Sequence, residues 1–469
     1  MKGEKSRLFN RGFLGLVIIG VLGRLAFIAI PGNTLQSPWS GGSDTGAYIL
    51  LAQNLLSGKG YTYAGQPTAF RPPGYPILLA AFTEFFGKHY VAAMRGFQFL
   101  EGLAIVLLCA AIAGRIFGKT AKTPALLLGL FIPTLVEITG EILTETTAAF
   151  LASVFLYFLV RYREKQQWQF LMGMSIAVGL GALVRPNLVF LELIALLVVC
   201  LQKNGGSRLR HAAVVILAPC ILMSPWVVRN LEVFHGRVLF STQGGPAAAT
   251  GIIEPQGRSQ YGDAERIKDA LGWVLPQVLE TNDPSRSLLP SEPEIDRRSW
   301  QVAYHLWRES GWGLIPIALK KVSYFWLSTD QIFWTRSFPR VQRTLRAIGV
   351  FAYWIILALA VIGWFSLRSE KPALARVFLL YVLFVTVMHL PFNMSTRYRI
   401  PLMDPLLVVL GAGTMATLTD RRSGHTRDTL NEMSPGTNNA PRLASRRSTR
   451  LLADALTLHG IACDNRRRA

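Results

Sequence analysis

A carboxylate and a guanidinium stand in the polar loop, residues 31–75, that follows the first apolar segment of this sequence. Asp44 comes after a Gly-Ser pair, and Arg71 opens the stretch Arg-Pro-Pro-Gly-Tyr-Pro at 71–76. Asp44 could serve as a general base or simply as the N-cap of a helix. The two prolines favour an extended backbone at Arg71, where a guanidinium could bind a phosphate in bidentate fashion or contact lipid headgroups. We expect the chemistry of the protein in this loop.

Three more arginines stand between later apolar runs, within short polar motifs. Arg185 lies in Arg-Pro-Asn, Arg229 follows Pro-Trp-Val-Val, and Arg399 lies in Arg-Tyr-Arg-Ile-Pro at 397–401. Each could contact lipid headgroups. The positive-inside pattern leaves few Lys and Arg residues on the outer side of the membrane, where we expect these three arginines. They could instead converge on one phosphate-rich pocket.

Three glutamates, Glu137, Glu141 and Glu145, follow one another at a spacing of four residues. An unbroken helix would place all three carboxylates on one face. Gly140 could break that helix and leave the first two in a solvated loop. Charged groups at membrane depth are costly and usually face a cavity, so Glu145, which two threonines follow, is the one that we expect to face inward.

The apolar residues of the chain gather in long runs, as they do in a polytopic membrane protein. The 469 residues are 51% hydrophobic and 16% charged, with a mean hydropathy of +0.32. Residues 350–365 carry no charge and residues 12–30 carry only Arg24, which is typical of membrane-spanning helices. We predict an all-α polytopic membrane protein with about ten transmembrane helices.

The net charge of +21 does not indicate nucleic-acid binding, because its distribution follows the membrane. Lys and Arg gather in short clusters between alternate apolar runs, which is the positive-inside pattern. This pattern places both termini in the cytoplasm and the loop 31–75 outside. We therefore predict a multi-pass protein of the plasma (inner) membrane.

The same alternation divides the chain into four parts. We predict a transmembrane module at 1–228, an extracytoplasmic segment at 229–346, further transmembrane helices at 347–418 and a basic, disordered cytoplasmic tail at 419–469. Three short stretches are predicted as surface helices: residues 44–56, with Tyr48 on the apolar face, residues 76–86, and residues 313–327.

Several common catalytic patterns are missing from the sequence. It has no P-loop, no GxSxG and no HExxH motif, and its four cysteines form no CxxC pair. We expect no cofactor and assign no metal ligand, while a divalent metal is not excluded. An activated substrate is then more readily lipid-borne than a nucleotide.

In their order and spacing, these motifs resemble the membrane glycosyltransferases of the GT-C fold. The similarity is to glycosyltransferase family 39 and its bacterial relatives, the group of protein O-mannosyltransferases and the lipid A aminoarabinose transferase. The residues that carry it are Asp44 with Tyr48, Ala-Gln-Asn-Leu-Leu-x-Gly-Lys-Gly-Tyr at 52–61, Arg-Pro-Pro-Gly-Tyr-Pro at 71–76, Leu-Thr-Glu at 143–145, Pro-Trp-Val-Val-Arg-Asn at 225–230 and Arg-Tyr-Arg-x-Pro at 397–401.

The resemblance implies a GT-C-type helical bundle that transfers a sugar, with inversion, from a polyprenyl phosphate to an acceptor hydroxyl on the outer face of the membrane. Asp44 would be the base that deprotonates this hydroxyl. The residues assigned to the donor phosphate are Arg71, Arg185, Arg229 and Arg399, and those assigned to the substrate pocket are Tyr48, Tyr75 and Glu145. The expected partners are the polyprenyl-phosphate-linked sugar donor, membrane lipids, and a lipid, glycan or protein acceptor.

This sequence departs from the pattern of the family at one position. Many relatives carry a second acid directly after the loop aspartate, where this chain has Thr45. The departure leaves the role of a metal open, and Glu145 could compensate for the missing acid.

Two other functions fit a polytopic bundle with outward arginines. A non-catalytic glycolipid transporter or flippase would tolerate the substitution Asp44→Asn with little loss. A polysaccharide polymerase or ligase would transfer a whole oligosaccharide and would need a larger acceptor groove, for which residues 229–346 leave room.

Overall fold

The computed structural model describes residues 2–29, 44–202, 207–253, 291–328 and 339–432. The predicted outer loop is therefore described only from residue 44 onward. The chain divides into two units, residues 1–420 and 421–469, and all packing reported below lies within the first. Apart from one two-stranded hairpin, the described elements are helices, so the predicted all-α class is confirmed.

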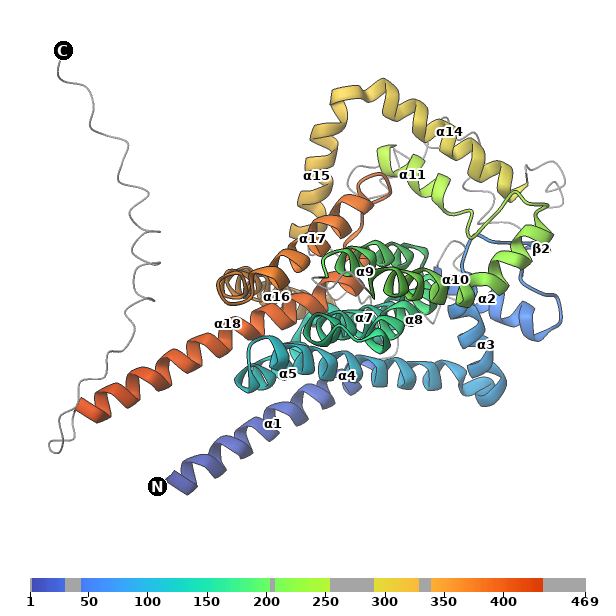
Figure 1. The fold of residues 1–469 in the computed structure, drawn as a ribbon. Helices are drawn as coiled ribbons and strands as arrows, with labels where there is room; N and C mark the ends of the chain where they lie inside the picture. Colours follow the sequence, from blue (N-terminus) through green and yellow to red (C-terminus); the bar gives the residue numbers. More distant parts are fainter. Residues whose placement is uncertain (1, 30–43, 203–206, 254–290, 329–338, 433–469) are drawn as a thin grey trace, which may run out of the picture. The chain divides into compact units, whose positions relative to one another are not determined.

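The elements follow one another along the chain as shown in Figure 1. The α-helices are α1 (Lys2–Ala29), α2 (Asp44–Leu56), α3 (Gly74–Phe86), α4 (Tyr90–Ile116), α5 (Lys122–Phe131), α6 (Pro133–Gly140), α7 (Glu145–Lys165), α8 (Trp168–Val184), α9 (Leu191–Cys200), α10 (Arg208–Val233), α11 (Gly244–Ile253), α14 (Glu292–Ser310), α15 (Leu314–Leu327), α16 (Pro339–Glu370), α17 (Pro372–His389) and α18 (Thr396–Glu432). The hairpin joins β1 (Thr62–Tyr63) and β2 (Gln66–Pro67), and 3-10 turns stand at η1 (Gly87–His89), η2 (Lys119–Ala121), η3 (Pro186–Phe190) and η6 (Gly311–Gly313).

Six helices of the described chain are long and apolar enough to cross a membrane, and seven if the bent pair α5 and α6 forms one span. The chain is thus a multi-pass membrane protein, but the predicted count of ten spans is not confirmed. One reason is length: α8 and α9 are apolar but shorter than the roughly 20 residues that a straight span needs. The third predicted span that is missing is 143–160, which corresponds to α7; this helix is not among the candidates and carries five charged residues, most of them in its last turns.

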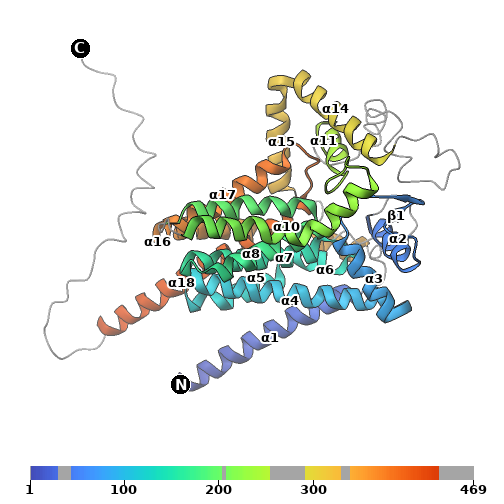
Figure 2. The ribbon, with the colours of Figure 1, turned by 45° about the vertical axis from the view of Figure 1, so that its right-hand side comes forward.

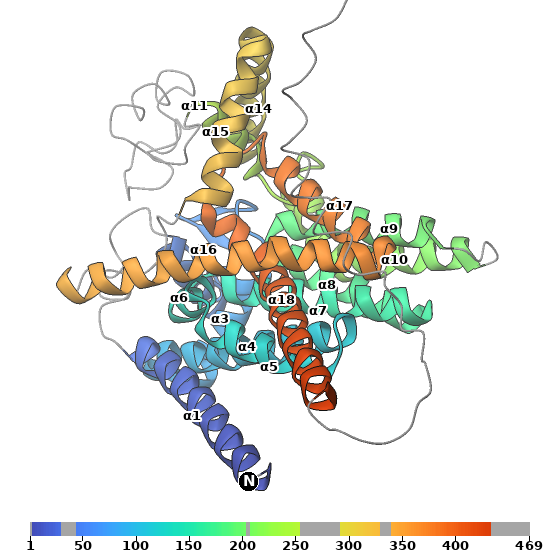
Figure 3. The ribbon, with the colours of Figure 1, turned by 90° about the vertical axis from the view of Figure 1, so that its left-hand side faces the viewer.

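The core of the bundle is built by α4, α5, α7, α8 and α10, which run side by side in Figure 2. Glycine lets α8 and α10 approach closely, since a Cβ at Gly179 would lie 3.0 Å from the Cα of Pro219. Small residues at such crossings are typical of packed membrane helices. Figure 3 shows α16 crossing α18, and Gly363 stands at this crossing against the carbonyl of Leu410.

A break between α6 and α7 decides the place of the three glutamates. Glu141 has an extended backbone (φ −93°, ψ 136°), α6 ends at Gly140 and α7 begins at Glu145. The three carboxylates therefore do not share one helical face. Gly140 marks the break, as the alternative interpretation of the sequence required, and Glu145 alone is buried, with a 2% exposed side chain.

The segment between α10 and α16 holds α11, α14 and α15. Figure 1 shows α14 beside α11, and an Asp296 carboxylate oxygen accepts a hydrogen bond from the backbone N–H of Gly245 at 2.7 Å. Glu292, the first residue of α14, accepts hydrogen bonds from the backbone N–H of Ala69 at 2.7 Å and the hydroxyl of Thr242 at 2.5 Å. These bonds attach α14 to the loop that carries Arg71.

The last helix is longer than the sequence predicts. It runs to Glu432, into the tail that we predict to be disordered from residue 419. Residues 433–469 of that tail lie outside the described part of the chain.

Candidate active site

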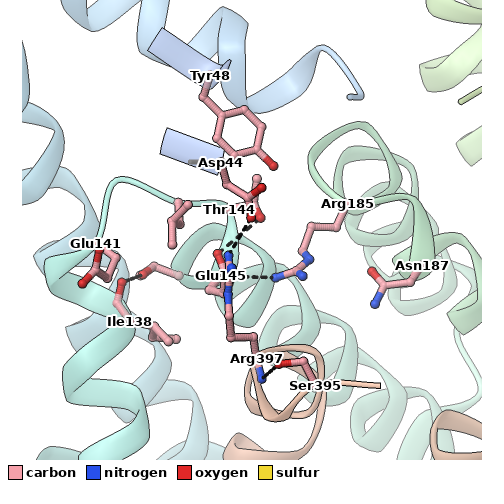
Figure 4. A network of polar contacts seen from close by, with 12 residues as sticks. Asp44, Tyr48, Ile138, Glu141, Thr144, Glu145, Arg185, Asn187, Ser395 and Arg397 are labelled. Carbon is pink, nitrogen blue, oxygen red and sulfur yellow. Dashed lines mark hydrogen bonds and ion pairs between the residues drawn. The ribbon is translucent and has the colours of Figure 1, made fainter. Parts of the chain in front are cut away.

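Asp44 is the centre of a network of ion pairs that joins α2 to the start of α18 (Figure 4). One carboxylate oxygen lies 2.6 Å from Arg71 Nη2, and the other lies 3.1 Å from Arg397 Nη2. The side chains of Asp44 and Arg397 are 35% and 32% exposed, whereas that of Arg71 is 11% exposed. The carboxylate is therefore partly exposed, with a guanidinium on either side.

Glu145 extends the network below Asp44. Its Oε1 accepts hydrogen bonds from Arg397 Nε at 2.8 Å and Nη2 at 2.6 Å, and it lies 3.2 Å from Arg185 Nη1. A buried carboxylate needs such partners, because desolvation of an unpaired charge is costly. Glu145 thus fixes two guanidiniums at the site.

These five side chains form a cluster: the guanidiniums of Arg71, Arg185 and Arg397 and the carboxylates of Asp44 and Glu145. The cluster carries an excess of positive charge, since three guanidiniums face two carboxylates. Burial alone would raise the pKa of Asp44, but Arg71 and Arg397 outweigh it and hold that pKa well below its usual range. Asp44 is therefore ionised at neutral pH. The net positive charge favours the binding of an anion such as a phosphate.

The backbone of the 71–76 stretch is held in place from two sides. The hydroxyl of Tyr61 donates to the carbonyl oxygens of Arg71 at 2.9 Å and Pro72 at 3.0 Å. Gly74 packs on the end of α8, where a Cβ would lie only 2.7 Å from the carbonyl oxygen of Leu183. This close approach brings Arg71 to the same end of the bundle as Arg185.

Two tyrosines lie at the side of Arg71. The Arg71 guanidinium is 4.8 Å from the centre of the Tyr48 ring, and its Nη1 donates to the Tyr48 hydroxyl at 3.2 Å. The rings of Tyr48 and Tyr75 meet edge to face at 5.1 Å. The structure therefore brings Asp44, Arg71, Arg185, Glu145 and both tyrosines into one region.

Arg229 lies elsewhere, where it supports the loop rather than the cluster. Its guanidinium donates to the backbone carbonyls of Thr68 at 2.9 Å and Tyr61 at 3.0 Å, and it lies 5.0 Å from the Trp226 ring. These bonds join α10 to the hairpin that precedes Arg71.

Arg399 is buried inside the bundle, with a 1% exposed side chain. It pairs with Asp404 at 3.2 Å and donates to the Tyr353 hydroxyl at 2.7 Å. Asp404 in turn accepts a hydrogen bond from Thr134 at 2.5 Å. The arginine of the 397–401 motif that reaches Asp44 is Arg397, which our sequence-based assignment did not choose.

The sequence holds no local signal that separates these two arginines correctly. Asp404 is an acid within an otherwise apolar span, and such a residue needs a buried partner. Residues seven apart on a helix, such as Arg397 and Asp404, share a face, whereas residues five apart, such as Arg399 and Asp404, point about 140° away from each other. Helical spacing therefore favours the wrong arginine as the partner of Asp404.

We expect the substitution Arg399→Ala to affect stability rather than donor binding. It would leave Asp404 buried and unpaired, which costs about 3–5 kcal/mol of unfolding free energy. Thermal unfolding in detergent should show a strongly lowered Tm for Arg399→Ala. The Tm of Arg399→Lys should lie between those of Arg399→Ala and the wild type. If Arg399→Ala keeps the Tm of the wild type but no longer uses the donor, Arg399 acts directly at the phosphate and the stability role is wrong.

Thr45, which stands where many relatives carry an acid, faces away from open space. Its side chain is buried, and its hydroxyl donates to the carbonyl oxygen of Ile142 at 3.3 Å. Among the described residues, no group of three or more His, Cys, Asp or Glu side chains is arranged to hold a metal ion.

Comparison with known proteins gives a family for part of the chain. Residues 70–228 match the family model described as dolichyl-phosphate-mannose-protein mannosyltransferase. The chain resembles this glycosyltransferase family. The matched segment contains Arg71, Glu145 and Arg185, whereas Asp44 and Arg397 lie outside it. With the multiple apolar helices, the match supports a membrane glycosyltransferase and confirms the resemblance that we predict from the sequence motifs.

Two enzymes are among the solved structures that have some likeness to the chain. ArnT from Cupriavidus metallidurans bound to undecaprenyl phosphate is 16% identical, with a TM-score of 0.38, over 92% of this chain and 81% of that one. The Archaeoglobus fulgidus oligosaccharyltransferase in the apo form is 14% identical, with a TM-score of 0.47, over 91% of this chain and 53% of that one. The chain thus spans about half of the archaeal enzyme. No curated protein matches the chain.

Proposed function

We propose that the protein is an inverting glycosyltransferase that moves a sugar from a polyprenyl phosphate to an acceptor hydroxyl on the outer face of the plasma membrane. The observation that carries this proposal is the Asp44 carboxylate held between Arg71 and Arg397. A base and an anion site then stand in one place. The family resemblance and the apolar helices support the reaction class and the lipid-linked donor.

The charge of the site suits the proposed donor. A polyprenyl-phosphate sugar is a phosphodiester with one negative charge, and the three guanidiniums exceed the two carboxylates by one positive charge. As the bond to the sugar breaks, the phosphate gains a second negative charge. Fixed guanidiniums stabilise this developing charge more than the charge of the bound donor.

The transfer itself needs one proton acceptor. Asp44 takes the proton of the acceptor hydroxyl while the oxygen of that hydroxyl forms a bond to the anomeric carbon of the sugar. The bond from that carbon to the phosphate oxygen breaks on the opposite face, and its electron pair leaves with the polyprenyl phosphate. The phosphate is a good leaving group without protonation, so a single carboxylate suffices and the configuration of the sugar inverts.

The pairing of Asp44 also controls its strength as a base. With Arg71 and Arg397 both bound to the carboxylate, its pKa is well below the usual range, and such a carboxylate is a weak base. A phosphate that binds the two guanidiniums weakens their hold on Asp44. The pKa of Asp44 then rises towards the value that proton transfer needs.

The test of the proposed function is transfer of radiolabelled sugar by the purified protein from membrane polyprenyl-phosphate sugars to cell-envelope acceptors. Transfer with inverted anomeric configuration supports the proposal. Absence of transfer from every polyprenyl-phosphate sugar in the preparation would overturn it and favour a glycolipid transporter.

We expect Arg71→Ala to weaken use of the donor by about tenfold to hundredfold, because a charge-assisted hydrogen bond to phosphate is lost. The measurement is kcat/KM for the donor in the transfer assay. Arg297→Ala is the control, since Arg297 is 62% exposed on α14 and pairs only with Glu294 among the described residues. Unchanged kcat/KM in a folded Arg71→Ala protein would count against the phosphate role.

A further inference from the structure

His389, near the end of α17, has a fixed arrangement of its ring hydrogen atoms. Its Nδ1 lies 2.7 Å from the backbone carbonyl oxygen of Val385. A carbonyl oxygen can only accept a hydrogen bond, so Nδ1 must carry the proton. In the neutral ring, Nε2 is then an acceptor.

This arrangement sets the orientation of the amide of Asn187 in η3. The Nδ2 of Asn187 lies 3.2 Å from His389 Nε2 and must donate to it. The carbonyl oxygen Oδ1 is consequently turned away from the histidine. It is buried, and no group in the described part of the chain donates a hydrogen bond to it.

The histidine that holds this amide is itself tightly packed. Its ring is buried, lies nearly parallel to that of Tyr398 at 5.9 Å, and packs against that of Phe325 at 5.4 Å. The Tyr398 ring also lies 5.2 Å from the Arg185 guanidinium. The amide of Asn187 is thus held by the same packed group that holds Arg185.

Figure 4 shows Asn187 beside Arg185, facing the cluster of Asp44, Glu145 and Arg397. A buried acceptor without a partner is rare in proteins, and at the edge of a site it favours a ligand that brings a donor. The oxygen repels the phosphate, which offers only acceptors. The matching group is a hydroxyl carried by the part of the ligand next to the phosphate.

We propose that Asn187 Oδ1 accepts a hydrogen bond from one hydroxyl of the transferred sugar, and that Asn187 is a specificity residue whose orientation His389 sets. This inference rests on the proposed function and adds to it a residue that selects the donor sugar. A site built to bind a hydroxyl discriminates strongly against a ligand that lacks it, because its buried polar group is left unpaired.

The experiment uses synthetic polyprenyl-phosphate hexoses, first to find one that the wild type transfers and then its forms that lack one hydroxyl each. For one of these deoxy donors, kcat/KM in the wild type should fall by about tenfold to hundredfold. Asn187→Ala should lower kcat/KM for the complete donor by a similar factor and lose nothing further with that deoxy donor. The other deoxy donors should show the same relative rates in both proteins.

A second variant tests the role of His389 and does not alter Asn187. His389→Phe keeps an aromatic ring between Tyr398 and Phe325 but removes the acceptor for the Asn187 amide. It should weaken the preference for the recognised hydroxyl. The matched control is Asn54→Ala, which removes an amide that donates to the Thr62 carbonyl and should keep the preference of the wild type.

Three results would overturn the inference, and they are distinguishable. Equal hydroxyl preferences in Asn187→Ala and the wild type would show that Asn187 does not select the sugar. Equal preferences together with a raised KM for the acceptor in Asn187→Ala would assign the oxygen to a hydroxyl of the acceptor instead. Absence of transfer by the wild type from every hexose donor and also from membrane polyprenyl-phosphate sugars would appear before any variant is made and would overturn the proposed function as well.

Discussion

Replacing Asp44 by Asn is expected to lower sugar transfer by between about a hundredfold and ten-thousandfold, the range that a general base contributes. Asparagine has nearly the same size and shape as aspartate but cannot take a proton from the acceptor. The measurement is transfer of radiolabelled sugar by wild type and Asp44→Asn at equal amounts of folded protein.

A control is available for the loss of a carboxylate in general. Asp296→Asn replaces an acid of α14 that accepts a hydrogen bond from the backbone N–H of Gly245 in α11, and it should keep most of the transfer activity. Full activity in Asp44→Asn would contradict the base role and reduce Asp44 to the acid at the start of α2. Absence of transfer in both the wild type and Asp44→Asn would instead favour a transporter.

The largest effect on stability is expected for Glu145→Ala. This substitution leaves Arg185 and Arg397 without the carboxylate that both contact. Breaking a buried ion pair by removing one partner costs about 3–5 kcal/mol. The Tm in detergent should fall strongly. Glu145→Gln keeps the shape and one hydrogen-bond acceptor, so its Tm should lie between those of the wild type and Glu145→Ala.

A surface acid provides the contrast for this prediction. Glu294 bonds Arg297 and Arg298 on the exposed face of α14, and Glu294→Ala should leave the Tm almost unchanged because solvent screens such pairs. Equal Tm values for Glu145→Ala and the wild type would mean that the two arginines find other partners. The ion-pair network would then not hold the site together.

Elements with a local signal were predicted well from the sequence. The predicted helices at 44–56 and 313–327 correspond to α2 (Asp44–Leu56) and α15 (Leu314–Leu327), and α3 (Gly74–Phe86) contains the predicted 76–86. Their apolar spacing and flanking glycines lie within the helices themselves or next to them. The positions of Asp44 and Arg71 in one loop were visible for the same reason.

Features that depend on distant partners were predicted less well. The choice between Arg397 and Arg399 depends on Asp404, Tyr353 and Phe325, which fill the space around Arg399. Likewise, the face on which Glu145 lies depends on the break at Glu141 rather than on the spacing of the glutamates. Tertiary packing decides both, and helical periodicity alone does not contain it.

For the proposed sugar transfer, the double pairing of Asp44 has a kinetic consequence. An acceptor that arrives first meets a carboxylate occupied by Arg71 and Arg397, whereas one that arrives after the donor meets a carboxylate that the phosphate has partly released. Productive turnover then follows a compulsory order of addition, with the lipid-linked sugar before the acceptor. The spent polyprenyl phosphate, which occupies the same guanidiniums, leaves last and competes with fresh donor for the enzyme.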